Sequence, residues 1–150
     1  MAEDWCDNCK IETCRVSRGM CHWVHCEHFA TEFDALRKSD KYAWSTLVAL
    51  VRQSESSVGL RAHHTFPMTS ARPVPIGELC ATGATKKPGP PPLHRLYYGQ
   101  PNRPPDQVVA LMVGTKKPGR GSARIMQTGH VRQAVNRYQA WAKASGVPEL

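Results

Sequence analysis

The chain has 150 residues, a formal net charge of +8 and 41% hydrophobic residues, which is enough to bury the core of one domain. No apolar run reaches membrane-spanning length and no signal-peptide pattern is present, so we expect neither a membrane span nor secretion, but a cytoplasmic protein. The charge is uneven, because residues 79–148 carry eleven lysines and arginines and a single acidic residue, Asp106. Charge that only solubilises a protein usually mixes both signs, so this half is predicted to face nucleic acid or another polyanion.

The first 26 residues are rich in cysteine and are predicted to bind zinc. Cys6 and Cys9 form a Cys-x-x-Cys pair, which can place two thiolates on one turn. Without an export signal, clustered cysteines indicate a metal site before they indicate disulfides. Cys14 and Cys21 are the first candidates to close a structural zinc tetrahedron, although residues 20–25 also fit a first strand. The remaining alternatives are free thiols, or replacement of a ligand by Cys26, His22, His25 or His28.

Residues 29–38 and 41–53 are predicted to form a helical hairpin. Ser39 and Asp40 make a break, and Asp40 can cap the second helix. Apolar residues recur at helical spacing in both helices, at Phe29, Phe33 and Leu36 and then at Trp44, Leu47, Val48 and Val51. The second helix offers few exposed hydrogen-bond donors, so packing against a sheet is favoured over a DNA-recognition role.

Loops and a short strand follow the predicted hairpin. Residues 54–75 are polar and then rich in proline and histidine, which predicts a long loop. Residues 76–81 fit a short strand. The sequence TKKPG occurs at residues 85–89 and again at 115–119, which indicates two positive loops of similar chemistry rather than a repeat architecture. The first of these loops contributes Lys86 and Lys87 as candidate contacts to nucleic acid.

Residues 93–98 and 107–115 are predicted to form the central strand pair. In the first strand, alternation places His94, Leu96 and Tyr98 on one face and Leu93, Arg95 and Tyr97 on the other. The second run is almost wholly apolar, which suits a strand covered on both faces, although a short buried helix has the same pattern. The positive loop after it carries three further cations, Lys116, Lys117 and Arg120.

A final helix is predicted from about residue 129 to 143, with Thr128 as its N-cap and Gly146 beyond its end. Val131, Val135, Tyr138 and Trp141 form its apolar stripe, and Arg132 lies on another face. His130 and Arg132 would then sit in the first turn, where free backbone amides favour an anion.

The candidate site combines cations with tyrosines and a histidine. Arginine can pair with phosphate and tyrosine can stack on bases, so such a set suits RNA binding. It also suits metal-independent RNA cleavage, in which a lysine of lowered pKa acts as base, arginine stabilises the phosphorane, and histidine, lysine or arginine protonates the leaving group. The catalytic candidates are Arg95, Lys116, Lys117, His130, Arg132 and Tyr138, and the candidates for nucleic-acid binding are Lys86, Lys87, Tyr97, Arg120 and Arg124.

The order of these elements resembles the RelE/HigB family of toxin–antitoxin mRNA interferases. In that family an R-x-x-Y strand precedes an apolar strand that ends in a Gly-Lys-Lys-like loop. Here Arg95-Leu96-Tyr97-Tyr98 and Val113-Gly114-Thr115-Lys116-Lys117 match those features, and FATEFDAL at residues 29–36 is similar to the family's first helix. The resemblance covers residues 22–143 loosely and 93–117 best.

The resemblance implies an α+β fold, in which a small twisted, mainly antiparallel sheet packs with an N-terminal helical hairpin and a C-terminal helix. It implies mRNA cleavage on the ribosome, inhibition by an antitoxin protein, and a phosphate-binding role for Arg95 with Lys116 or Lys117 as the loop cation. Residues 1–26 would then be an extension and residues 27–150 the RelE-like domain. The extension and the 54–75 loop depart from the family's pattern. Two alternatives therefore stay open, a free-standing toxin and a phage or mobile-element derivative with altered activity.

Two other functions fit the same sequence. One is a zinc-stabilised regulator that binds nucleic acid on the same positive face without cleaving it. The other is an interaction protein whose basic face meets an acidic protein partner.

Overall fold

A computed structural model describes residues 20–56, 60, 76–84, 89–101, 106–116 and 123–146, with side chains from residue 129 onward in the last segment. These residues form three helices and a four-stranded mixed sheet, which confirms the predicted α+β class. No helix among them is long and apolar enough to cross a membrane. The elements in chain order are β1 (His22–His25), α1 (Phe29–Ser39), α2 (Lys41–Glu55), β2 (Ile76–Thr82), β3 (Leu93–Gly99), β4 (Gln107–Lys116) and α3 (Ala123–Ser145).

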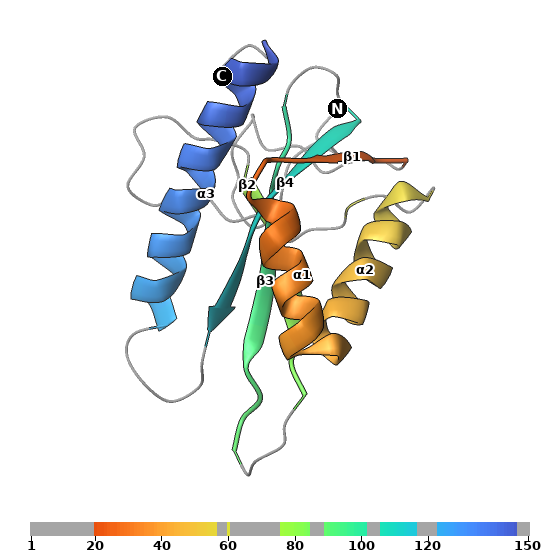
Figure 1. Cartoon of the computed structure of the whole chain (residues 1–150), viewed down its shortest axis with the longest axis vertical. Coiled ribbons are helices and arrows are strands. Elements are labelled where there is room, and N and C mark those ends of the chain that lie inside the picture. The colour runs from red at the N-terminus through yellow and green to blue at the C-terminus, as the bar shows by residue number, and fades with distance from the viewer. Residues whose placement is uncertain are drawn as a thin grey trace, which may run out of the picture.

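The sheet has the strand order β1-β4-β3-β2, so the predicted strand pair lies at its centre. β3 pairs antiparallel with both of its neighbours, whereas β1 pairs parallel with β4. The hairpin of α1 and α2 covers one face and α3 covers the other, which gives three layers (Figure 1). We call these the hairpin face and the α3 face of the sheet. β4 is therefore buried on both sides, as its apolar sequence predicted.

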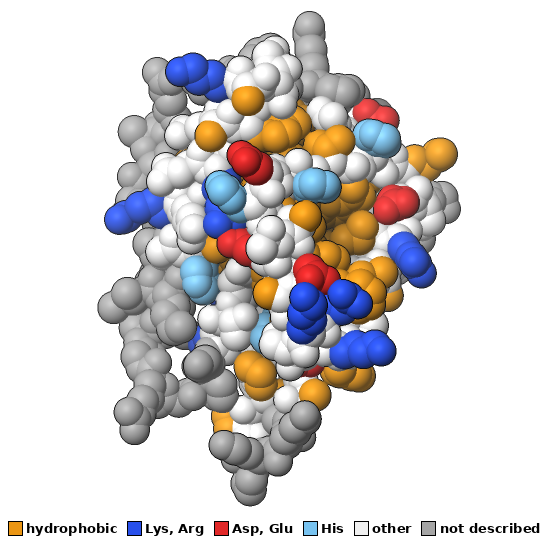
Figure 2. Space-filling view, in the orientation of Figure 1, with side chains coloured by type: hydrophobic (Ala, Val, Ile, Leu, Met, Phe, Trp, Pro, Cys, Tyr) orange, Lys and Arg blue, Asp and Glu red, His pale blue; other side chains and the backbone are white. Residues whose placement is uncertain are grey.

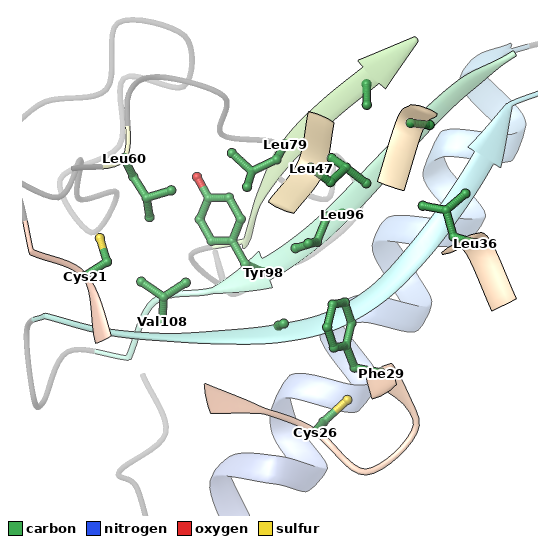
Figure 3. Packing of buried hydrophobic residues seen from close by; sticks show 13 residues of the cluster. Cys21, Cys26, Phe29, Leu36, Leu47, Leu60, Leu79, Leu96, Tyr98 and Val108 are labelled. Carbon is green, nitrogen blue, oxygen red and sulfur yellow. The ribbon is translucent and has the colours of Figure 1, made fainter. Parts of the chain in front are cut away.

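The hairpin face carries the larger hydrophobic cluster, in which Leu96, Tyr98 and Val108 of the sheet meet Phe29, Leu36 and Leu47 of the two helices (Figure 3). Tyr98 is almost fully buried, and its ring lies directly over Gly77 on the neighbouring strand. A Cβ at residue 77 would come within 2.2 Å of that ring, so this strand position has room only for glycine. The close approach of the Tyr98 ring thus explains why a glycine stands within β2.

A β-bulge at Leu111 changes which face each residue of β4 occupies. Tyr97 is paired with Met112 but Tyr98 is paired with Ala110, so Leu111 is an extra residue opposite β3. As a result, Leu111 and Met112 both pack on the α3 face, while Val113 returns to the hairpin face. Strict alternation from Val108 would have placed Met112 on the hairpin face and Val113 on the α3 face, the reverse of what is observed.

Side chains complete the edge of β4 beyond the end of β1. The carbonyl of Leu111 accepts hydrogen bonds from Arg137 Nη1 at 2.9 Å and from Cys26 Sγ at 3.1 Å. Glu32 Oε1 accepts from the backbone N–H of Val113 at 3.2 Å. Glu32 and Arg137 also pair with each other through two hydrogen bonds of 2.7 Å. This Glu32–Arg137 clasp joins α1 to α3 across the strand edge and satisfies backbone groups that an edge otherwise leaves open.

The start of α2 is fixed by Asp40, as predicted. Its carboxylate accepts from the backbone N–H of Ala43 at 3.1 Å, and it also lies 3.2 Å from Nε2 of the buried His94. Nδ1 of His94 lies 2.9 Å from Thr115 Oγ1 on β4. Burial alone would raise the pKa of Asp40, but hydrogen bonds from Ala43, Ala84 and His94 outweigh it and the pKa is lowered. The network ties the turn of the hairpin to both central strands.

The boundaries of two helices differ from the prediction. α2 continues to Glu55, past the predicted end near Gln53. α3 begins at Ala123, so Thr128 is not its N-cap and His130 and Arg132 lie in the helix interior. The predicted anion site at a first turn carrying these two residues is therefore wrong. At the other end Gly146 has φ +69°, as expected for a glycine that terminates a helix.

Removing the clasp should destabilise the fold. Glu32→Ala leaves Arg137 and the Val113 N–H without their carboxylate, so we expect a loss of about 2–3 kcal/mol in the free energy of unfolding. Asp34→Ala is the matched control, because Asp34 forms exposed ion pairs within the same helix and its removal should cost much less. Urea denaturation followed by circular dichroism measures both changes. Equal losses would contradict the role of the clasp.

Candidate functional site

The candidate site lies on the α3 face, where three neighbouring strands place polar residues side by side. Cys80, Arg95 and Gly114 are opposite one another in the register of β2, β3 and β4. The adjacent row on the same face contains Glu78 and Tyr97. Opposite residues of paired strands project to the same side, so this register gathers an acid, a thiol, a guanidinium and a phenol beneath α3.

Arg95 forms an ion pair with Glu78 at the centre of this face. Arg95 Nε lies 3.3 Å from Glu78 Oε2, and the two side chains are only 12% and 13% exposed. The contact is not aligned as a hydrogen bond, so Nε has no hydrogen-bond partner among the described residues. A buried guanidinium with an unused donor is suited to bind an anion, provided that the anion displaces Glu78.

Tyr97 is fully buried beside this pair, and its hydroxyl has no hydrogen-bond partner among the described residues. Burial raises the pKa of Tyr97, and the negative charge of Glu78 raises it further, although Arg95 acts in the opposite direction. The phenol is therefore protonated at neutral pH. In this arrangement Tyr97 has no face open to a base, so it does not form the stacking surface that the sequence predicted.

His130 on α3 completes the group from above the sheet. Its ring centroid lies 6.1 Å from that of Tyr97, and the two rings meet edge to face. Gly114 makes this approach possible, because a Cβ there would come within 2.6 Å of His130 Nδ1. Burial lowers the pKa of His130 and the charge of Arg95 lowers it further, while Glu32 opposes the shift. His130 is thus neutral near pH 7 and can accept a proton.

The other predicted catalytic residues are spread more widely. Lys116 is opposite Leu93, so it shares the α3 face with Arg95 as a diagonal neighbour. The Cα atoms of such neighbours typically lie about 7 Å apart. Arg132 is exposed on α3. Tyr138 packs over Gly99 at the far end of β3, and burial raises its pKa to about 12. The structure brings Lys116 to the Arg95 group but places Tyr138 away from it.

Several predicted ligands and contacts lie outside the described residues. These are the metal candidates Cys6, Cys9 and Cys14, the loop cations Lys86, Lys87, Lys117 and Arg120, and the side chain of Arg124. Cys21 is described, and it is buried within the hydrophobic cluster of the hairpin face. Within the described ranges, no three histidine, cysteine or acidic side chains are grouped so as to hold a metal ion.

Sequence reasoning missed the contribution of β2 to this site. Glu78 and Cys80 are two residues apart, so alternation alone could have placed them on one face. Cys80 Sγ lies 3.9 Å from Glu78 Oε1. Burial raises the pKa of the Cys80 thiol, and Glu78 raises it further, so the thiol is protonated at neutral pH and poorly nucleophilic. Which residues of β3 these two oppose depends on the register, which the sequence does not reveal.

Comparison with known proteins gives no relative on which a function could be based. No protein-family model matches the chain, and neither the curated proteins nor the solved structures contain a match.

The pKa of His130 can be measured directly. In an NMR titration we expect its ring to titrate below 6.5, the ordinary value, because burial and Arg95 disfavour the imidazolium. Arg95→Met removes the cationic neighbour and should move the pKa of His130 upward. The same protein unfolded in urea supplies the reference. A folded-state pKa above the reference value would contradict the description of the site.

Proposed function

We propose that the chain is a metal-independent endoribonuclease of the RelE/HigB type that acts on mRNA in the cytoplasm. The observation that supports this most strongly is the meeting of Arg95, Tyr97 and His130 beneath α3, with Lys116 on the same face. The partners implied by the proposal are mRNA, the ribosome and an inhibitory antitoxin protein.

The proposed reaction uses the 2′-hydroxyl of RNA as nucleophile. His130 takes the proton of this hydroxyl, because a neutral imidazole is a competent base near pH 7. The 2′-oxygen then bonds to phosphorus, and the bond from phosphorus to the 5′-oxygen breaks. Arg95 stabilises the charge on the phosphorane, and Lys116 supplies the proton to the departing 5′-oxygen. The products are a 2′,3′-cyclic phosphate and a free 5′-hydroxyl.

Binding of the phosphate requires Arg95 to exchange partners. In the free protein Glu78 neutralises the guanidinium at 3.3 Å. A phosphate group is negatively charged, like the Glu78 carboxylate, and it offers two acceptor oxygens to the planar guanidinium of Arg95. We therefore propose that Glu78 is the counter-ion of the resting site and that RNA displaces it.

Cleavage should depend on Arg95 and on His130. We expect Arg95→Ala and His130→Gln each to reduce mRNA cleavage on translating ribosomes by about 100-fold or more, since each loses one catalytic group. Arg37→Ala is the matched control, because this arginine is exposed on α1, on the hairpin face, and should leave cleavage unchanged. Mapping of new mRNA ends measures the rate, and thermal unfolding establishes that each variant folds. Full cleavage by a folded Arg95→Ala variant would overturn the assignment.

A second candidate is a regulator that binds nucleic acid without cleaving it. The observation that favours it over cleavage is the low exposure of Arg95, whose charge is already neutralised by Glu78. In that case the same ribosome assay should give no new mRNA ends. RNA would still bind, with an affinity that falls steeply as salt rises.

Zinc binding by the N-terminal cysteines is proposed independently of the site on the sheet. We expect about one zinc per chain after purification without chelator, because Cys6 and Cys9 have the spacing of a zinc knuckle. The double substitution Cys6→Ser/Cys9→Ser should lose the metal, whereas Cys80→Ser, in the cluster around Arg95, should retain it. Elemental analysis measures the metal content. A metal-free protein that remains folded would rule out the structural zinc.

A further inference from the structure

A hollow of about 270 Å³ opens on the hairpin face, between α1, α2 and β1. Figure 2 shows hydrophobic side chains gathered between the two helices at this place. Its floor belongs to β3 and β4, and its long walls belong to the helices. The floor and these walls are apolar, and they comprise Leu96, Ala110, Phe29, Phe33, Val48 and Val51.

Aromatic side chains stand at two ends of the hollow, Phe33 at one and Trp23 at the other. At one end Phe33 lies against Trp44, with ring centroids 6.0 Å apart, where the helices approach their shared turn. At the other end stands Trp23 of β1, whose indole Nε1 donates to Ser54 Oγ at 2.7 Å and whose ring meets Tyr98 edge-on. These contacts hold Phe33 and Trp23 in position, so this part of the lining is formed before any ligand binds.

The volume of the hollow fits a compact ligand. A dry protein cavity of roughly 150 Å³ holds benzene, so about 270 Å³ has room for roughly ten non-hydrogen atoms. That is the size of an indole or a naphthalene. Two turns of a helix, about 10 Å wide and about 11 Å long, would need a much larger volume than this hollow offers.

The mouth of the hollow carries an available cation. Arg52 of α2 is exposed at the rim and forms no ion pair with any residue that the structure describes. Glu55 lies one turn further along the same helix. A guanidinium beside an apolar hollow complements a ligand that joins an apolar body to a carboxylate.

We propose that this hollow is a binding site for a small amphipathic anion, with a compact aromatic body in the hollow and a carboxylate on Arg52. The hollow lies on the opposite face of the sheet from Arg95 and His130, so the inference does not depend on the proposed nuclease function. The ligand class follows from the apolar lining, the volume and the guanidinium of Arg52 at the rim.

Two probes of equal size separate the contributions of the hollow and the charge. We would titrate the full chain with 2-naphthoate and with its uncharged analogue 2-naphthalenemethanol, and follow the NMR signal of the Trp23 indole N–H. Both probes should shift this signal in a saturable way. Arg52→Gln should weaken naphthoate by about threefold to tenfold and leave the alcohol unchanged. Glu55→Gln should tighten naphthoate, because it removes a like charge from the rim.

Further variants control for folding and for other occupants. Val48→Gln places a polar group in the wall and should weaken both probes, whereas Arg37→Gln, at an exposed arginine on α1 that does not line the hollow, should change neither. Circular dichroism establishes that each variant folds. The proposal is overturned if neither probe saturates at millimolar concentration, or if Arg52→Gln weakens both probes equally. It is also overturned if the Trp23 signal shifts with protein concentration alone, since a second copy then fills the hollow.

Discussion

The fold depends on how β4 is satisfied along an edge that β1 covers only in part. β1 pairs with residues 107–110, and beyond them the strand still has backbone groups to pair. The bulge turns the carbonyl of Leu111 toward this edge, where Arg137 of the clasp donates to it. Glu32 of the clasp accepts from the next N–H at the edge, that of Val113. Because the clasp comes from α1 and α3, the same contact holds the outer layers of the molecule to the sheet. An unpaired edge at this position would be both costly and open to aggregation.

The bulge also determines which residues of β4 join the Arg95 site. By shifting the phase of β4 it places Gly114 and Lys116 on the α3 face, beside Arg95, and Thr115 on the hairpin face, beside His94. Without the shift a threonine side chain would occupy the space into which His130 fits. The catalytic proposal and the apolar hollow thus use opposite faces of the same central strands. The Arg95 site holds buried charge, whereas the hollow is lined by apolar side chains and has its cation at the rim.

Much of the architecture was predictable because the relevant signals are local. The helical spacing of Phe29, Phe33 and Leu36, the capping oxygen of Asp40 and the alternation around Arg95 each depend on neighbouring residues alone. The start of α3 was not predictable in this way. Thr128 and Gly129 look like a helix start, but propensity is weak and the helix continues through them as far back as Ala123.

The sequence by itself determined the three helices, the strands of the central pair and the face on which Arg95 lies, because periodicity encodes which side of an element is buried. Only the tertiary structure decided what Arg95 meets. Glu78 comes from another strand through the register, His130 comes from a helix that crosses the sheet, and the bulge adjusts the phase between them. Register and bulges arise from packing between segments far apart in the chain, so no local pattern reports them. The same reason hid the hollow, whose walls come from β1, both helices of the hairpin and the central strands.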